Sequence, residues 1–134
     1  MRVLMRGLLA LSLVMGAVVP GQAQDLHKKP DGQWEIEYKD SRYQVELCGE
    51  DGWQLCATLT WLGNGADNKE NLPYLNTRII DHARPVAPNQ WKGDLHLYGH
   101  TASGTITQVS DNQLSIQGCL LVVLCKTFQM YRMN

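Results

Sequence analysis

Bulky apolar and polar residues alternate along short runs of this sequence, and turn-forming residues separate the runs. Residues 34–39 show the pattern most strictly, with Trp34, Ile36 and Tyr38 each followed by a charged residue. A two-residue period is typical of a β-strand with one buried face. After residue 24 no helical period of 3.6 residues persists for ten residues. The chain is therefore expected to fold into an all-β structure.

Similar runs recur to the end of the chain, at residues 42–48, 55–61, 91–97, 105–109, 113–119 and 125–131, with a shorter one at 78–80. Between them, residues 63–76 predict a long loop, residues 84–90 a proline-containing connection, and Ser103-Gly104 a turn. These runs and turns predict seven or eight short antiparallel strands. We favour a roughly eight-stranded closed barrel over a sandwich, because closure removes exposed strand edges.

The N-terminal residues have the composition of a secretory signal peptide. Two arginines precede an apolar stretch at residues 8–19, and small residues precede a predicted cleavage after Ala23. The alternative, a buried N-terminal helix, lacks an amphipathic stripe. We expect residues 1–23 to be removed and residues 24–134 to form one domain, periplasmic or secreted. No cysteine lies near the predicted cleavage site, so no lipid anchor is expected.

Charge and hydropathy argue against a nucleic-acid partner and against a membrane-spanning segment. The formal net charge of the 134 residues is −1 and no run of Lys or Arg occurs, which argues against a nucleic-acid-binding surface. No internal segment reaches the roughly 18 apolar residues that a membrane span needs. We therefore expect neither a nucleic-acid partner nor a membrane span.

Four cysteines predict two disulfides, since an exported chain meets an oxidising compartment. Zinc is the competing interpretation, but the paired C-x2-C spacing of zinc ribbons and of thioredoxin-like sites is missing. Cys48 and Cys56 fall on one face of neighbouring predicted strands, as do Cys119 and Cys125. Cross-strand neighbours lie close enough for a disulfide. We predict the hairpin disulfides Cys48–Cys56 and Cys119–Cys125, and no metal.

A set of short motifs occurs in an order that resembles a known family. In chain order the motifs are Gly32-Gln33-Trp34, Val45-Glu46-Leu47-Cys48, Leu55-Cys56, Thr60-Trp61-Leu62, Trp91-Lys92-Gly93, Gly118-Cys119 and Tyr131-Arg132. This order resembles the DUF2147 family, small exported bacterial proteins of uncharacterised function. The resemblance implies an eight-stranded, lipocalin-like barrel. It also implies a structural pair in which Trp34 packs under Arg132 through a cation–π contact.

Six side chains fall on the predicted inner faces of the strands: Tyr38, Tyr43, Leu59, Trp61, Leu95 and Leu97. An eight-stranded barrel can be just wide enough to be filled by its own side chains. The other interpretation is the lining of an apolar ligand cavity. Both interpretations stay open. We expect that some of these side chains fill the core and that others line a small cavity at one mouth of the barrel.

The segment between the last two cysteines is apolar throughout and contains no turn-forming residue: Leu120, Leu121, Val122, Val123 and Leu124. Loops are normally polar and lie on the surface. We expect the segment to fold over the barrel end as a plug. Two alternatives are an apolar tip offered to a partner, ligand or membrane, and strands that run further into the segment.

Residues with catalytic chemistry do not form a recognisable set. His96 and His100 on one strand would lie about 13 Å apart, too far to share an ion. Asp94, His100 and Ser103 can be drawn as a triad, but the Gly-x-Ser-x-Gly elbow is missing. No phosphate-binding glycine loop is present. We expect no cofactor, no catalytic residues and a protein that is not an enzyme.

The leading hypothesis is therefore an exported barrel that binds a small apolar or amphipathic molecule at its mouth. The alternative is a protein–protein module, such as an inhibitor of a secreted hydrolase of the lysozyme type. Such inhibitors present a polar loop containing Ser-Gly, and residues 101–104 resemble it faintly. The sequence does not specify a protein partner.

Overall fold

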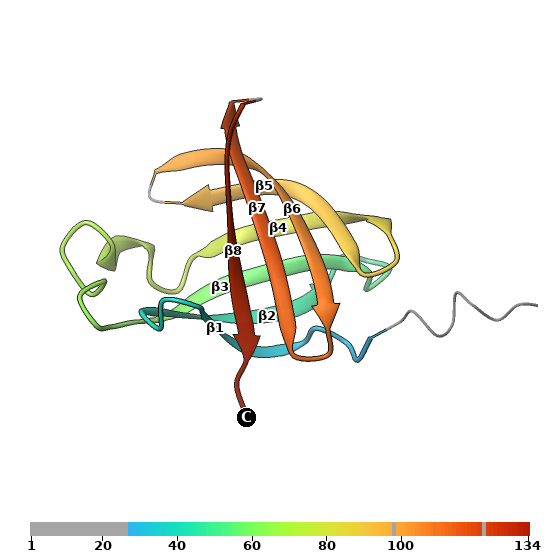
Figure 1. Cartoon of the computed structure of the whole chain (residues 1–134), viewed down its shortest axis with the longest axis horizontal. Helices are drawn as coiled ribbons and strands as arrows, with labels where there is room; N and C mark the ends of the chain where they lie inside the picture. The colour runs from blue at the N-terminus through green and yellow to red at the C-terminus, as the bar shows by residue number, and fades with distance from the viewer. Residues whose placement is uncertain (1–26, 98, 122) are drawn as a thin grey trace, which may run out of the picture.

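Eight antiparallel strands form a closed barrel in the computed structural model, which describes residues 27–97, 99–121 and 123–134. Each strand pairs with the next, and the last pairs with the first (Figure 1). The strands are β1 (Gly32–Ile36), β2 (Ser41–Cys48), β3 (Gln54–Leu62), β4 (Arg78–Ala87), β5 (Gln90–Leu97), β6 (His100–Ser110), β7 (Gln113–Leu121) and β8 (Leu124–Arg132). The predicted all-β closed barrel is confirmed. The predicted signal peptide, residues 1–23, lies outside the described residues.

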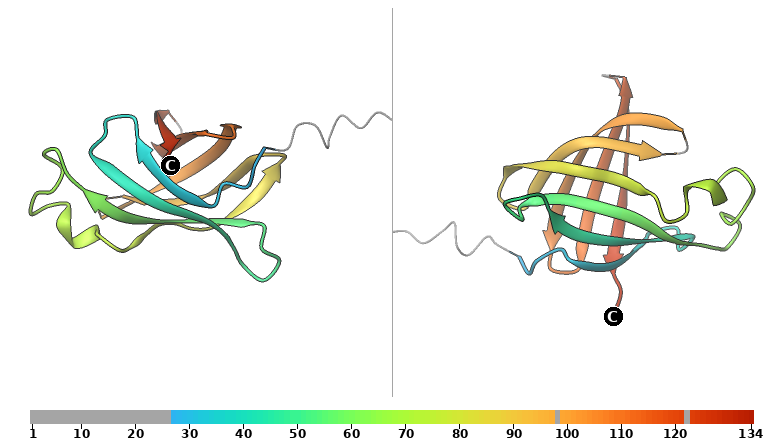
Figure 2. Two further views of the ribbon diagram at one scale, coloured as in Figure 1. Left: turned by 90° about the horizontal axis from the view of Figure 1, so that it is seen from below. Right: turned by 180° about the vertical axis from the view of Figure 1, so that it is seen from behind.

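Up-and-down connectivity gives the barrel two ends of different structure (Figure 2). The strapped end, as we call it, carries the hairpin turns at 49–53, 88–89 and 111–112, the segment 27–31 and the C-terminus. The mouth, as we call the other end, carries the turn at 37–40 and a long loop at 63–77. This loop contains the short 3-10 helix η1 (Leu72–Tyr74). Within the described residues, no helix has the length and hydropathy needed to cross a bilayer.

Side chains from the inner faces of the strands fill the barrel and form one buried cluster. The largest fully buried members include Trp34, Ile80, Ile106, Leu114 and Met130. Each large apolar side chain buried in this way stabilises the fold by about 1.5–3 kcal/mol. Of the side chains predicted to face inward, Tyr43, Leu59 and Leu95 belong to the cluster, and Leu97 packs against it half-buried.

Tyr38 does not face inward, contrary to the sequence prediction. Strand β1 ends at Ile36, and the amide of Lys39 donates to the carbonyl of Ile36 at 2.8 Å to close a turn. Lys39 takes a left-handed conformation with a φ of 58°. Tyr38 is carried outward and is 54% exposed. The alternation of apolar and charged residues continues past the end of the strand, so it misplaced this side chain.

Trp61 also lies outside the barrel, because β3 contains a bulge. Arg42 pairs with Trp61 and Tyr43 pairs with Leu59, so Thr60 is an extra residue that has no partner on β2. An extra residue reverses the faces of the positions that follow it. Leu62 is therefore buried, and the indole of Trp61 lies on the outer surface under the guanidinium of Arg42, 4.2 Å from the ring centre.

Two predicted connections are in fact strand. Residues 84–87 continue β4, and Ser103 and Gly104 lie within β6. Gly104 is a packing glycine rather than a turn residue, since a Cβ at this position would lie 2.5 Å from Cγ of Leu95. It pairs directly with Gly93 on β5 and Gly118 on β7. Gly104 and Gly118 thus give Leu95 room to reach across the sheet, while Gly93 gives room to Ala83 on β4.

We expect Gly104→Ala to lower the free energy of unfolding by about 1–3 kcal/mol, because the new methyl group overpacks the buried Leu95. Gly118→Ala is the matched control, since its Cβ would lie 3.1 Å from Leu95, where a small shift suffices. Urea unfolding of both variants measures the difference. An equal loss in the two variants would contradict the packing role of Gly104.

Arg132 fastens the strapped end. Its guanidinium lies 4.5 Å from the ring centre of Trp34, its cross-strand partner, so the predicted pair is present. Its three nitrogens donate to backbone carbonyls, those of Lys29, Asp31 and Asp111, at 2.8, 2.8 and 3.0 Å. Nε1 of the fully buried Trp34 donates to the carbonyl of Pro30 at 2.8 Å. Together these bonds hold the segment 27–31 across the barrel.

Replacing Arg132 by Met keeps the length of the side chain but removes the cation and three donors. We expect Arg132→Met to lower the free energy of unfolding by about 2–3 kcal/mol. The control, Arg84→Met, changes an exposed arginine on β4 and is expected to shift stability by no more than about 0.5 kcal/mol. Thermal unfolding of both variants distinguishes the fastening from a general effect of charge.

Candidate functional site

Two hollows open side by side at the mouth and share Leu97, Lys126 and Phe128. The first hollow has a volume of about 290 Å³ and extends from these residues to the end of β1 and the turn at 37–40. The second hollow, of about 220 Å³, lies between the start of β6 and the hairpin of β7 and β8. The two hollows are therefore neighbours, and together they form the candidate site.

The first hollow combines an apolar wall with polar groups at its far side. Its remaining lining residues are Ile36, Tyr38, Asp40, Ser41, Tyr43 and Ile79. The hydroxyls of Ser41 and Tyr43 lie 2.9 Å apart and are both buried. Tyr38 stands at the rim, where a hydrogen bond to the Glu37 carboxylate raises the pKa of its phenol above the ordinary value. This hollow can therefore accept an apolar group and offer hydroxyls to a polar one.

The second hollow is almost wholly apolar. Besides the shared residues it is lined by His100, Ala102, Gly118, Leu120 and Leu124. Lys126 shares the strand face of Phe128 and Met130, which points inward, and its cross-strand partner is Gly118. Because Gly118 has no side chain, space is left beside Lys126 that a larger residue would fill. Among the described residues, no acidic side chain lines this hollow.

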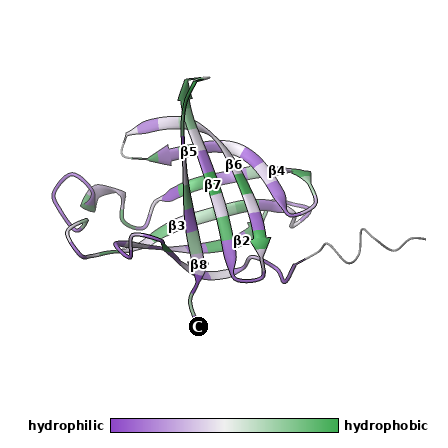
Figure 3. Cartoon of the chain, viewed as in Figure 1, coloured by the Kyte–Doolittle hydropathy of each residue, from purple (hydrophilic) through white to green (hydrophobic). Residues whose placement is uncertain are grey.

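Beyond the second hollow, the hairpin of β7 and β8 projects as an apolar tip (Figures 1 and 3). Its side chains are between 58% and 83% exposed: Leu120, Leu121, Val123 and Leu124. The predicted plug is therefore wrong, because β7 runs to Leu121 and β8 starts at Leu124, as in one of the alternatives. Val122 lies outside the described residues.

The predicted disulfide Cys119–Cys125 is confirmed and ties the base of this tip. The two residues are direct cross-strand partners, and their Cα atoms lie 4.0 Å apart. The bond thus keeps Leu120 and Leu124 facing the second hollow, although the strands there extend past the buried core.

We expect the double substitution Cys119→Ala and Cys125→Ala to lower the free energy of unfolding by about 2 kcal/mol, as loop closure predicts for so short a segment. Amide hydrogen exchange should also speed up at residues 118–126 while β2 to β5 stay protected. Uniform acceleration through the whole barrel would contradict a local role for this bond.

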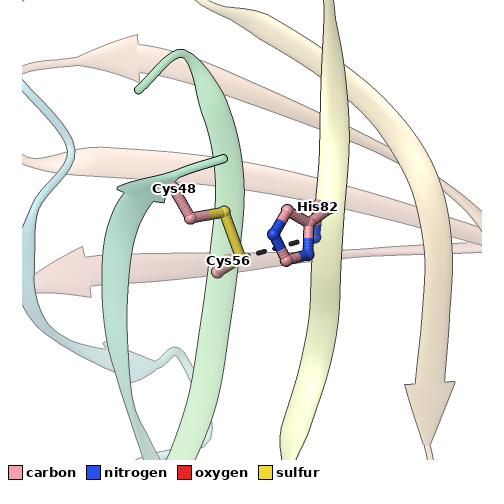
Figure 4. Close-up of side chains that lie close together, drawn as sticks. All are labelled: Cys48, Cys56 and His82. Atoms are coloured by element: carbon pink, nitrogen blue, oxygen red, sulfur yellow. Dashed lines mark hydrogen bonds between the residues drawn. A yellow bond between two sulfur atoms is a disulfide. The ribbon is translucent and has the colours of Figure 1, made fainter. Parts of the chain in front are cut away.

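The other predicted disulfide, Cys48–Cys56, is also confirmed, with the two cysteines diagonal to each other across β2 and β3. His82 lies beside it on a bulge of β4, with a φ of 59°, and its amide donates to Sγ of Cys56 at 3.4 Å (Figure 4). The pKa of the Asp81 carboxyl is lowered, mainly by a hydrogen bond from Arg78 and next by one from His82. A cysteine binds a metal ion through its thiolate. Cys48 and Cys56 are joined in the disulfide and provide no thiolate, so with His82 they do not form a set of metal ligands.

The remaining residues with catalytic or metal-binding side chains are not brought together. Asp94 and Ser103 pair across β5 and β6, both exposed, while His100 stands three residues away along β6. His96 and His100 border one shallow hollow, but among the described residues no third metal-binding side chain joins them. Residues 101–104, compared above with an inhibitor loop, lie in β6.

A further hollow of about 360 Å³ at the strapped end was not foreseen from the sequence. Its lining residues come from the segment before β1 and from four strands with their turns: His27, Lys29, Pro30, Leu47, Trp53, Pro85, Ala87, Pro88, Asn89, Trp91 and Gln108. Lys126 and Phe128 at the mouth were not foreseen either. The signal for them was the parity of β8, because Lys126 is a charged residue in line with Phe128 and Met130.

The fold and its mouth define a lipocalin-like β-barrel. The chain belongs to the DUF2147 family, described as an uncharacterized protein conserved in bacteria, whose sequence pattern matches residues 32–132. A comparison with curated proteins gives no match. Among solved structures, the chain is similar to protein HP1028 from the human pathogen Helicobacter pylori, described as belonging to the lipocalin family. The TM-score is 0.57 at 17% identity, over 78% of this chain and 82% of that one. This likeness concerns the fold alone.

Proposed function

We propose that this protein is an exported binding module, not an enzyme, that holds a small apolar or amphipathic molecule at its mouth. The observation that carries the proposal is the pair of joined hollows, walled by Leu97 and Phe128 and reached directly from solvent. Ligand sites are typically concave and mainly apolar, with a few polar groups that orient the ligand. The Ser41–Tyr43 hydroxyl pair and Lys126 are such groups.

The size of the hollows restricts the ligand. Volumes of about 290 and 220 Å³ lie at or below the lower end of the range usual for ligand sites, roughly 300–1,000 Å³. The centre of the barrel is filled by Trp34, Ile106 and their neighbours, so a ligand stays near the surface. These two facts favour a compact molecule or a single alkyl chain over a large ring system.

We place the ligand at the mouth rather than in the larger hollow at the strapped end, because several polar groups of that hollow hold the segment 27–31 and the hairpin turns in place. The side-chain Nε2 of Gln108 donates to the carbonyl of Lys28 at 2.7 Å, and the backbone N–H of Gln108 donates to the carbonyl of Asn89. Nε1 of Trp91 donates to the carbonyl of Trp53 at 2.9 Å. These groups are committed to the structure of the barrel, while the basic side chains of His27 and Lys29 also border the hollow.

Native mass spectrometry of the protein, expressed with its own N-terminus and purified from the periplasm or medium, tests the proposal. We expect a chain that begins at Gln24, lacks four cysteine protons and carries an adduct of a few hundred daltons that is released on denaturation. A chain that keeps residues 1–23 would overturn the export part of the proposal.

The location of the site is tested with a neutral fluorescent probe, N-phenyl-1-naphthylamine. Leu124→Asn should weaken probe binding about fivefold, because it removes apolar surface from the second hollow. Val86→Asn is the matched control, an equally exposed apolar strand residue on β4, away from the mouth. No binding by the wild type, or equal loss in both variants, would overturn a ligand site at the mouth.

A further inference from the structure

We infer that the mouth selects amphiphiles with an anionic head group, and that Lys126 is the residue that recognises it. The inference rests on the proposed function and names the chemical class of its ligand. Its starting point is the position of Lys126, which lines both hollows at the place where they meet. Carboxylate, sulfate and phosphate heads share the chemistry that an ammonium group binds.

The side chain of Lys126 lies where an apolar residue would be expected. The three inward positions of β8 in this region are Lys126, Phe128 and Met130, and Met130 is buried in the core. Lys126 faces Gly118 across the strand pair, so no cross-strand side chain covers it. Its aliphatic stem can lie along Phe128 and Leu124 while the ammonium group reaches the opening of the site.

Within the described part of the chain, Lys126 forms no ion pair and no hydrogen bond. Arg42, Arg78 and Arg132, by contrast, are each held by a carboxylate or by carbonyl groups. Lys39 and Lys92 also form no ion pair among the described residues, but neither lines the two hollows. A cation set into an apolar wall without an acidic partner makes the local potential positive. An anionic head group supplies the missing partner.

The other charged groups at the mouth place the head group at the second hollow. His100 is the second basic side chain there, and no described acidic residue lines that hollow. Asp40 is the acidic residue of the first hollow, at its far side next to Ser41. An anion is therefore favoured beside Lys126 and repelled by Asp40, while the alkyl chain lies over Leu97 and Phe128, which border both hollows.

Titration calorimetry with three probes of one chain length tests this inference: dodecanoate, 1-dodecanol and dodecyltrimethylammonium, each kept below its micelle concentration. We expect dodecanoate to bind most tightly to the wild type and the cationic probe least. Lys126→Met keeps the length of the side chain and should weaken dodecanoate binding about threefold. Lys126→Glu reverses the charge and should weaken it about tenfold. The control is Lys92→Glu, on the exposed face of β5 towards the strapped end, and it should leave dodecanoate binding unchanged.

The outcomes separate the inference from the proposed function. If dodecanol binds as tightly as dodecanoate and the Lys126 variants match the wild type, the mouth binds amphiphiles but the anionic preference is overturned. If none of the probes binds, both are overturned. Binding to phosphatidylglycerol vesicles without binding of monomeric dodecanoate also overturns the inference, in favour of a membrane surface. Tighter binding of dodecanol by Lys126→Met, with weaker binding of dodecanoate, supports it.

Discussion

The contact between Arg132 and Trp34 is the interaction on which the two-ended organisation of this barrel depends. One guanidinium stacks on the indole and donates to three carbonyls that belong to the segment before β1 and to the β6–β7 turn. First strand, last strand and N-terminal segment are thus joined at a single point. The strapped end is therefore held by its own bonds, whereas strands β7 and β8 leave the core at the other end and border the hollows of the mouth.

The filled interior has the same consequence for function. Leu95 lies over the glycines of β6 and β7, Gly104 and Gly118, and with Ile106 and Met130 it occupies the space that a wider barrel would leave for a ligand. An eight-stranded barrel has little spare volume once large side chains point inward. The proposed ligand site therefore lies at the mouth and not at the centre, since the inward positions of β8 continue past the core there as Phe128, Lys126 and Leu124.

The hairpin of β7 and β8 gives the mouth its asymmetry. A disulfide at Cys119–Cys125 holds two strands together beyond the barrel rim, so apolar side chains stay on the surface that a loop would leave polar (Figure 3). The opposite rim is polar, with Asp40, the Ser41–Tyr43 hydroxyls and Tyr38. A mouth with one apolar wall, one polar rim and Lys126 between them would suit the proposed ligand, a molecule divided into an apolar and a charged part.

The sequence by itself determined the strand class, both disulfide pairs and the inner faces of most strands, because alternation is a local property that every half-buried strand carries. Only the tertiary structure decided where that alternation stops or reverses. The turn after Ile36 exposes Tyr38, and the bulge at Thr60 sends Trp61 outward, although both continue the local pattern. Gly104 looked like a turn residue until Leu95, from the neighbouring strand, explained it as packing. Lys126 was not predicted as a site residue, and the structure places it at the mouth. The exposure of Tyr38 depends on a turn that the alternation does not reveal. The other three outcomes depend on a neighbouring strand, and a pattern along one strand holds no information about its neighbour.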